Sequence, residues 1–222
     1  DAGFDGLVIE NFGDAPFHRG TADDPVPPDV PAALAVAADR IAQETGMPIG
    51  INCLRNDGVA ALGVASVVSA QWVRVNVLTG AYVTDQGLIA GDAARLAAYR
   101  RQLRVRTTLL ADFMVKHAKP LVSFDLATAA RDLAERSGAD GLVLSGSRTG
   151  QPVDVALCDT IRQAVGAFPM WIGSGLDPDN AKELWPRCNG AIVGTWCKVD
   201  GHSTNAVDPK RAAILRAACV PG

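Results

Sequence analysis

Two short apolar runs carry polar side chains at alternate positions, and these side chains could bind or transform a ligand. Arg74 and Asn76 alternate with valines in the first run, and Asp112 and Lys116 alternate with apolar residues in the second. Because successive side chains of a strand point to opposite faces, each polar pair shares one face. If helices cover the apolar faces, the four polar side chains point inward together. Buried charges must pair with one another or serve a ligand, so an internal ion-pair network and a ligand-binding site remain as alternatives.

Further polar side chains follow the neighbouring apolar runs, where they could contact a substrate. Asn52 shares the inward face of its run, and either Glu10 or Asn11 reaches the same region, since the three residues before them are all apolar. Asp112 or Glu10 could transfer a proton, and Lys116 could stabilise developing negative charge or form a Schiff base. The candidate substrate-binding residues are Asn11, Asn52, Arg55, Asn56, Asp57, Arg74, Asn76, Asp85 and Thr149.

Glycines at the ends of the last two apolar runs predict a phosphate site. Gly173-Ser174-Gly175 ends one run, and Gly194-Thr195 lies in the next. Glycines let main-chain amides approach an anion, and the two hydroxyls add donors. A short helix after Asp177 would aim its N-terminus at the same place. The alternative is ordinary turns, with Asp177 capping that helix.

Apolar runs and alanine-rich segments alternate along the chain and must position these residues. Continuous runs of Val, Ile and Leu are typical of parallel strands that helices cover on both faces. Strands are predicted at Gly6–Asn11, Pro48–Leu54, Trp72–Leu78, Leu109–His117, Gly141–Gly146, Met170–Gly175 and Gly190–Cys197. Helices are predicted at Pro31–Thr45, Asp57–Ser69, Gly91–Arg106, Leu126–Ser137, Val155–Gly166, Pro178–Trp185 and Pro209–Ala218.

The start of the chain repeats a later helix-to-strand junction. Ala2–Ile9 is echoed by Ser137–Leu144, so the chain opens at a helix end and a preceding strand and helix are expected to be missing. Seven strands plus one predict a (β/α)8 TIM barrel, in which residues 1–222 form a single domain with strands two to eight. Its chemistry would lie at the carboxyl ends of the strands. A doubly wound open sheet is the alternative, but no Gly-x-Gly-x-x-Gly follows the early strands.

Composition narrows the partners that we expect. A net charge of −3 argues against nucleic acid, and no apolar run reaches the about 18 residues that a membrane span needs. We therefore expect a cytoplasmic protein that binds a phosphorylated small molecule and could form a homo-oligomer. The five cysteines are widely spaced, which predicts buried free thiols rather than disulfides or zinc. No cofactor and no transition metal are expected, although oxygen ligands could hold magnesium.

Longer motifs resemble those of a known family. Asp5–Phe17, Gly50–Asp57, Arg74–Asn76, Asp85–Gly87 and Asp112–Ala118 resemble the BtpA/SgcQ family, as do Thr149-Gly150, Gly173–Gly175, Asn180 and Ile192–Thr195, so the resemblance covers essentially the whole chain. It implies a (β/α)8 barrel of the ribulose-phosphate-binding type, similar to phosphoribosylanthranilate isomerase. Family members usually begin with a strand and helix, including a histidine-containing segment, that this sequence lacks.

The resemblance implies two functions, and the inward polar residues help to choose between them. One family member resembles an assembly or stability factor for photosystem I, whereas sugar-utilisation members suggest a phosphosugar enzyme. A scaffold has no evident need for inward Arg74, Asp112 and Lys116 opposite a phosphate site. The hypothesis is therefore an enzyme acting on a phosphorylated pentose or nucleotide-like substrate, as an isomerase or a lyase or hydrolase. The alternative is a non-catalytic factor in photosystem I biogenesis.

Overall fold

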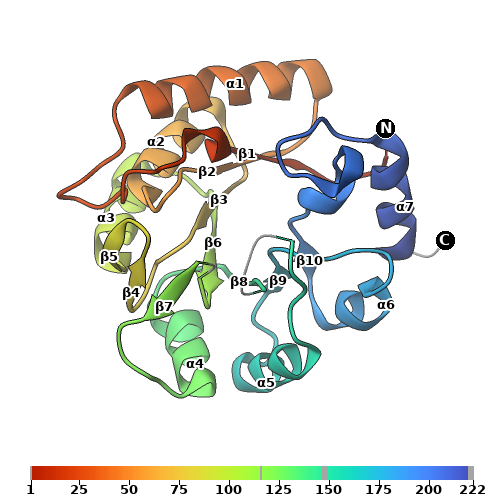
Figure 1. The fold of residues 1–222 in the computed structure, drawn as a ribbon. Helices are drawn as coiled ribbons and strands as arrows, with labels where there is room; N and C mark the ends of the chain where they lie inside the picture. The colour runs from red at the N-terminus through yellow and green to blue at the C-terminus, as the bar shows by residue number, and fades with distance from the viewer. Residues whose placement is uncertain (1, 116, 147–149, 220–222) are drawn as a thin grey trace.

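Seven parallel strands form a curved wall with helices outside it, which confirms the predicted α/β barrel architecture (Figure 1). The computed structural model describes residues 2–115, 117–146 and 150–219. The strands follow the order β1-β2-β3-β6-β8-β9-β10, and among the described residues β1 and β10 each pair with one strand only. Their bounds are β1 Leu7–Glu10, β2 Ile49–Asn52, β3 Trp72–Val75, β6 Thr108–Phe113, β8 Gly141–Leu144, β9 Met170–Ile172 and β10 Gly190–Ala191.

Helices connect the strands and cover the outside of the wall. Asp57, Asp92, Asp125 and Asp154 each cap a helix by accepting a hydrogen bond from a main-chain N–H of its first turn. The α-helices are α1 Asp29–Thr45, α2 Gly58–Val68, α3 Ala93–Leu103, α4 Leu126–Arg136, α5 Val155–Val165, α6 Ala181–Leu184 and α7 Pro209–Cys219. Single turns of 3-10 helix lie at η1 Phe12–Asp14, η2 Trp185–Arg187, η3 Thr195–Cys197 and η4 Val199–Gly201.

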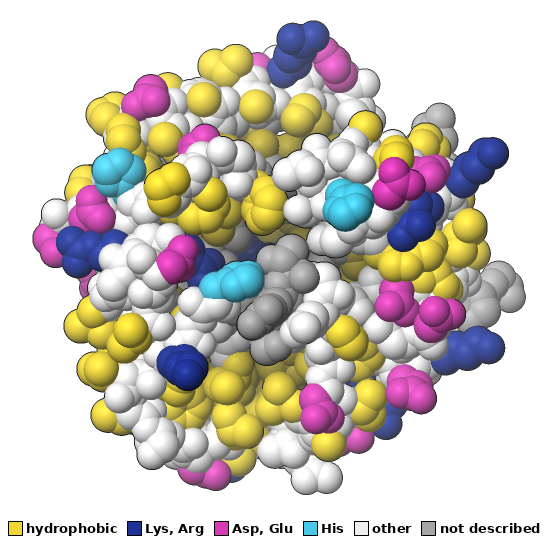
Figure 2. Space-filling view, in the orientation of Figure 1, with side chains coloured by type: hydrophobic (Ala, Val, Ile, Leu, Met, Phe, Trp, Pro, Cys, Tyr) yellow, Lys and Arg dark blue, Asp and Glu magenta, His cyan; other side chains and the backbone are white. Residues whose placement is uncertain are grey.

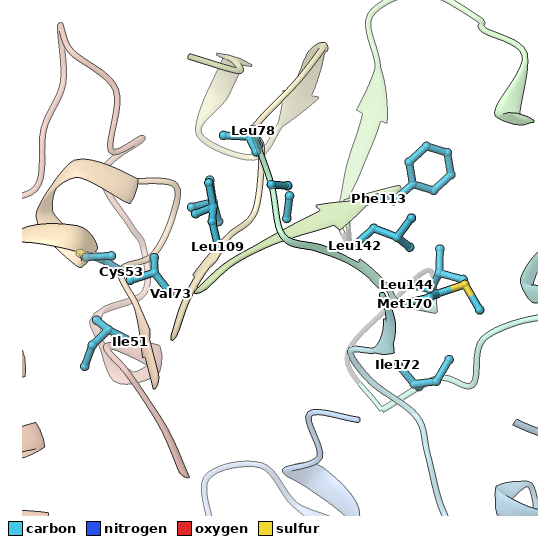
Figure 3. Close-up of a cluster of buried hydrophobic side chains, with 14 of the residues drawn as sticks. Ile51, Cys53, Val73, Leu78, Leu109, Phe113, Leu142, Leu144, Met170 and Ile172 are labelled. Carbon is cyan, nitrogen blue, oxygen red and sulfur yellow. The ribbon is translucent and has the colours of Figure 1, made fainter. Parts of the chain in front are cut away.

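The main hydrophobic core lies between the outer face of the wall and the helices. Ile51, Val73, Leu109, Leu142 and Ile172 come from five different strands and are each at most 2% exposed (Figure 3). Fully burying one such side chain contributes about 1.5–3 kcal/mol. These apolar residues alternate with the inward set, so the same packing that stabilises the wall directs the polar residues of β3 and β6 into the barrel.

Large side chains on the inner face lie opposite glycines and fill the amino end of the barrel. The Trp72 indole occupies the space that a Cβ atom on Gly6 or Gly50 would need, and Trp171 stands in the same relation to Gly190. We call these five residues the barrel floor. The Trp72 Nε1 atom is buried without a hydrogen-bond partner. Because the floor fills this end, the polar groups of the interior gather towards the carboxyl ends of the strands.

An accessory antiparallel sheet, absent from the sequence prediction, joins the segments that follow β3 and β6. Its strands are β4 Ala81–Thr84, β5 Gly87–Ala90 and β7 Ala118–Pro120, in the order β5-β4-β7. The predicted strand Leu109–His117 is therefore wrong beyond Phe113, where positive φ angles at Met114 and His117 turn the chain. Strands β4 and β5 form a hairpin in which Tyr82 pairs with Ile89 and two residues make the turn. Two short apolar runs separated by two residues are a sequence pattern typical of a hairpin, and the prediction did not use it.

Two other predicted elements are shorter than expected. The strand predicted at Gly190–Cys197 ends at Ala191, and η3 begins at Thr195. The helix predicted at Pro178–Trp185 is a single α-helical turn over Ala181–Leu184, followed by η2. All five cysteines are free, and all but Cys188 are buried, as the spacing predicts. In the described part of the chain no helix is long and apolar enough to cross a membrane.

Candidate functional site

A buried ion pair between β3 and β6 forms the centre of the site. Arg74 Nε and Nη2 donate to the two carboxylate oxygens of Asp112 at 2.8 and 2.9 Å, and Asn76 Nδ2 donates to Asp112 Oδ2 at 2.9 Å. The side chains of Arg74 and Asp112 are 6% and 1% exposed. Burial opposes the charge on the Arg74 guanidinium, but the Asp112 carboxylate outweighs burial and raises the pKa of Arg74. The Arg74 guanidinium therefore keeps its charge inside the protein.

Unpartnered polar atoms surround this ion pair. In the described part of the chain, both amide atoms of Asn52, Asn76 Oδ1 and Ser145 Oγ are buried and have no hydrogen-bond partner. Each such atom costs about 1–3 kcal/mol unless a ligand or an ordered water pairs with it. Pairing between Arg74 and Asp112 therefore leaves these atoms of Asn52, Asn76 and Ser145 without hydrogen bonds. An ion pair that only stabilises the fold does not explain why these polar residues are in the interior.

Gly173 lets β9 approach the ion pair closely. A Cβ atom on Gly173 would lie 2.6 Å from Ser145 Oγ and 3.2 Å from Arg74 Nη2. The same Cβ atom would overlap Val143 Cγ1. Real Cβ atoms essentially never make contacts under 3.0 Å, so an alanine at this position would require Val143 and Ser145 to shift. Ser145 was not among the predicted site residues. The period-two rule that placed Arg74 inward also places Ser145 inward, two residues beyond Val143, and could have found it.

Glu10 and Asn11, which the sequence left as alternatives, have different roles. Asn11 Oδ1 accepts from Leu54 N at 2.7 Å, and Asn11 Nδ2 donates to Leu54 O at 3.2 Å. Asn11 thus holds the main chain that follows β2. Glu10 lies in register with Asn52, which in turn lies in register with Arg74, and the Glu10 charge helps to raise the pKa of Arg74. Glu10 is therefore the one of the two that acts on the centre of the site.

Arg55 places a second buried cation near the ion pair. Its residue is 9% exposed. Burial lowers the pKa of Arg55, while the charges of Asp112 and Asp85 oppose that shift. Asp85 itself is exposed in the turn between β4 and β5. The accessory sheet therefore contributes a carboxylate to the electrostatic surroundings of Arg55.

Asn56 and Asp57, both predicted to bind substrate, bond to main-chain groups. The Asn56 amide accepts from Val77 N at 2.6 Å and donates to Val77 O at 2.9 Å. Asp57 accepts from Ala60 N at 2.9 Å as the cap of α2 and from Val26 N at 3.1 Å. These contacts tie the segment after β2 to the segment after β3 and to the proline-rich loop that precedes α1. In this structure both side chains position other parts of the chain.

The predicted phosphate residues lie where the segments after β8, β9 and β10 meet. Ser174 Oγ accepts from Gly146 N at 3.2 Å, and the main chain of Gly175 packs against that of Gln151 with φ +69°. Thr195 lies against Gly150, and among the described residues nothing lies within 4 Å of a Cβ atom on Gly194. The described part of the chain therefore leaves the Cβ side of Gly194 uncovered, and the hydroxyl-bearing Thr195 follows it directly.

Asp177 holds the turn before α6 but does not cap that helix, whose N-cap residue is Asn180 and has no side-chain cap hydrogen bond. Asp177 Oδ1 accepts from the main-chain N–H groups of Asp179 and Asn180 at 2.9 Å each. Asn180 Nδ2 donates to Gly175 O at 2.7 Å, which fixes the turn that contains Gly175. Because α6 is a single turn, the proposed phosphate site does not rest on its N-terminus.

Tyr82 of the accessory sheet is a further group near the site that the sequence interpretation missed. It is 6% exposed and packs with Val77, Ile89 and Val115. Burial raises the pKa of Tyr82, and the Asp112 charge raises it further. The phenol is therefore kept protonated close to the carboxylate.

The three histidines of the chain lie in segments that follow strands β1, β6 and β10. Histidine side chains are visible on the face shown in Figure 2, so this view shows the carboxyl ends of the strands. Basic and acidic side chains border the middle of the same face (Figure 2). Two predicted site residues, Lys116 and Thr149, lie outside the described residues. Within the described ranges, no three His, Cys, Asp or Glu side chains are grouped so that they could hold a metal ion.

A sequence model of the BtpA family matches residues 1–219. The chain belongs to the BtpA family. The photosystem I biogenesis protein BtpA of Synechocystis sp. is 44% identical over 220 residues, which cover 99% of this chain and 75% of the relative. This agrees with the family resemblance that the motifs carry.

Solved structures show the same fold for this BtpA family chain. N-(5′-phosphoribosyl)anthranilate isomerase from Pyrococcus furiosus aligns with a TM-score of 0.57 and 15% identity, over 83% of this chain and 80% of that one. An archaeal fructose 1,6-bisphosphate aldolase aligns with a TM-score of 0.54 and 15% identity, over 99% of this chain and 79% of that one. At this identity the likeness shows the barrel fold and does not identify the chemistry.

Proposed function

We propose that the chain is an enzyme that acts on a phosphorylated pentose or nucleotide-like substrate, by isomerisation or by cleavage at a sugar carbon as a lyase or hydrolase. The observation that carries this proposal is the buried Arg74–Asp112 pair with unpartnered polar atoms of Asn52, Asn76 and Ser145 around it. A protein that acts only through its outer surface gains nothing from such groups, because each one destabilises the fold. The two solved relatives named above act on phosphorylated compounds and support the same substrate class.

The phosphate would bind beside Gly194 and Thr195, with Ser174, Gly173 and Gly175 forming the adjacent wall. The Cβ side of Gly194, which no described residue covers, and the hydroxyl of Thr195 suit a phosphate oxygen. Binding energy from a fixed phosphate would orient the reacting carbon towards Arg74 and Asp112, which lie on β3 and β6. The substrate would thus extend from the segment after β10 towards the opposite side of the barrel.

Glu10 is our candidate for the group that moves the proton. Both Asp112 oxygens already accept hydrogen bonds from Arg74 or Asn76, whereas the described residues offer Glu10 no hydrogen bond. Asp112 would then hold the Arg74 guanidinium in place, and Arg74 would stabilise negative charge that develops on the substrate. We assign Lys116 the same electrostatic role. Arg55 and Asn52 would contact the substrate, with Asn11, Asn56 and Asp57 holding the segments that carry them.

A thermal-shift experiment tests whether the site binds a phosphosugar. A ligand at ten times its Kd stabilises the folded state by about 1.4 kcal/mol, which raises Tm by about 3–6 °C in a chain of this size. We expect this shift with ribose 5-phosphate or a nucleoside monophosphate and not with free ribose. If no member of a phosphosugar panel raises Tm, the proposal fails.

Two variants separate binding from chemistry. Glu10→Gln should abolish turnover of the phosphosugar, followed by NMR, and leave its binding intact. Gly194→Val should weaken binding, because its side chain would enter the region where no described atom lies within 4 Å of the added Cβ atom. Urea denaturation of the variant accompanies this test, since φ −143° with ψ −69° lies outside the regions that valine prefers. Ala33→Val, which adds two methyl groups on the exposed face of α1, serves as the control. Equal binding by Gly194→Val and the control would exclude the phosphate position.

Exposed apolar residues on the accessory sheet and directly after β7 favour a second candidate function. We propose as this alternative a non-catalytic assembly factor, in line with the Synechocystis relative, which is named as a photosystem I biogenesis protein. Val83, Leu88, Leu121 and Val122 are 49%, 49%, 55% and 69% exposed. The test is the double variant Leu88→Lys/Val122→Lys in a Synechocystis strain that lacks its own BtpA. Loss of rescue by this variant, with rescue retained by Glu10→Gln, would favour the assembly function.

A further inference from the structure

The unpartnered atoms of the barrel interior require a ligand group that both donates and accepts hydrogen bonds. Of the six buried unpartnered side-chain atoms in the described residues, five are inward: Asn52 Nδ2 and Oδ1, Asn76 Oδ1, Ser145 Oγ and Trp72 Nε1. Asn76 has already used its Nδ2 on Asp112, so its free oxygen needs a donor. The Asn52 amide needs a donor and an acceptor, and a serine hydroxyl can serve as either.

The atoms of Asn52, Asn76 and Ser145 are grouped around the Arg74 guanidinium, whereas Trp72 Nε1 belongs to the barrel floor. Asn52 lies in register with Arg74 on the neighbouring strand, and Asn76 shares the Asp112 carboxylate with Arg74. Ser145 Oγ and Arg74 Nη2 both lie within 3.2 Å of the position that a Cβ atom on Gly173 would occupy. A single small group placed beside Arg74 would therefore meet several of them.

The pattern excludes an anionic group at this position. Phosphate and carboxylate oxygens only accept hydrogen bonds, so they cannot satisfy Asn52 Oδ1 or Asn76 Oδ1. The Asp112 carboxylate also repels a second anion. A hydroxyl both donates and accepts hydrogen bonds. Two hydroxyls on adjacent carbon atoms therefore supply two donors and two acceptors close together.

We infer that Asn52, Asn76 and Ser145 bind the vicinal hydroxyls of the sugar, and that the site selects a ribose-type phosphopentose over its 2-deoxy form. This inference rests on the proposed function, since it assumes that the phosphopentose enters the barrel with its phosphate at the Gly194 end. A site built to bond a hydroxyl rejects the analogue that lacks it, because the site's own polar atoms then remain unpaired. For one missing hydroxyl we expect about 10- to 100-fold weaker binding.

Calorimetric titration of ribose 5-phosphate and 2-deoxyribose 5-phosphate tests the inference. The unmodified chain should bind the ribose form at least about 10-fold more tightly. Asn52→Leu, similar in size but without polar atoms, should lose most of this preference while still binding the 2-deoxy form. Ser145→Ala is the milder variant if Asn52→Leu fails to fold, and Ser123→Ala, exposed before α4, is its matched control.

The outcomes distinguish this inference from the function on which it rests. If both sugars bind with equal affinity, ordered water satisfies the unpartnered atoms and the inference is wrong, while phosphosugar binding stands. The same conclusion follows if Ser145→Ala and Asn52→Leu both keep the full preference. If neither phosphosugar binds, the proposed function fails and the hydroxyl selection fails with it.

Discussion

The Arg74–Asp112 pair allows a direct test of whether the barrel interior is built for stability or for a ligand. Asp112→Leu would leave the Arg74 guanidinium buried without its carboxylate, and breaking a buried pair in this way costs about 3–5 kcal/mol. Arg74→Met would strand the Asp112 carboxylate with Asn76 alone, at a similar cost. At about 2–4 °C per kcal/mol, each single variant should lower Tm by about 6–20 °C.

The double variant Arg74→Met/Asp112→Leu should behave differently. Replacing a whole buried ion pair by apolar residues is often neutral or stabilising by about 1–4 kcal/mol. Against this stands the loss of a partner for Asn76 Nδ2, which costs about 1–3 kcal/mol. We therefore expect the double variant to lie within about 2 kcal/mol of the unmodified chain, although additive single effects would predict a loss of about 6–10 kcal/mol.

Urea denaturation of the four proteins, followed by far-UV circular dichroism, measures this coupling, and phosphosugar titration of the same samples measures function. A stable double variant without binding would show that the pair is retained for the ligand. A double variant as unstable as the sum of the singles would refute the reasoning about the pair's energetics. One that binds the phosphosugar as tightly as the unmodified chain would remove the pair from the ligand site.

Three further predictions follow from other parts of the structure. Gly50→Ala should destabilise the chain by about 1–3 kcal/mol in urea denaturation, because its Cβ atom collides with the Trp72 indole, and Trp72→Leu should recover part of the loss. Asp57→Ala should cost about 0.5–2 kcal/mol through the lost cap of α2, while Asp154→Ala, a cap without the second contact to Val26, should cost less. Burial raises the pKa of Cys53 to about 12 and that of Cys158 to about 11, so at pH 8 both thiols should resist iodoacetamide until urea unfolds the chain, as mass spectrometry of the labelled peptides would show. Rapid labelling of either thiol in the folded chain would contradict their burial.

The sequence predicts the parts of this protein in which one periodic pattern decides the structure. The alternation in β3 places Arg74 and Asn76 on the inner face, and both bond to Asp112. Continuous apolar runs predict buried parallel strands, because both faces of such strands pack against other atoms. The barrel architecture follows from the alternation of these strands with helices.

Other roles could not be predicted, because residue type alone does not distinguish a side chain that bonds the main chain from one that faces a ligand. Asn11, Asn56 and Asp57 occupy the expected positions after strands, yet their polar atoms serve Leu54, Val77 and the first turn of α2. The bonds of Asn11 and Asn56 join residues 43 and 21 positions apart and depend on the finished fold. The end of β6 at Phe113 depends likewise on pairing between β4 and β7.

The accessory sheet also determines how the mouth of the barrel can open. Because β4 follows β3 and β7 follows β6, the antiparallel pairing of Tyr82 with Pro120 and of Thr84 with Ala118 joins two neighbouring loops into one unit. Separating these loops would break main-chain hydrogen bonds and expose the cluster around Ile89. Under the proposed function, a substrate that entered between them would have to overcome that cost at every turnover. The segments after β1 and β10, which lie outside this sheet, would then offer an entry route that disrupts the fold less.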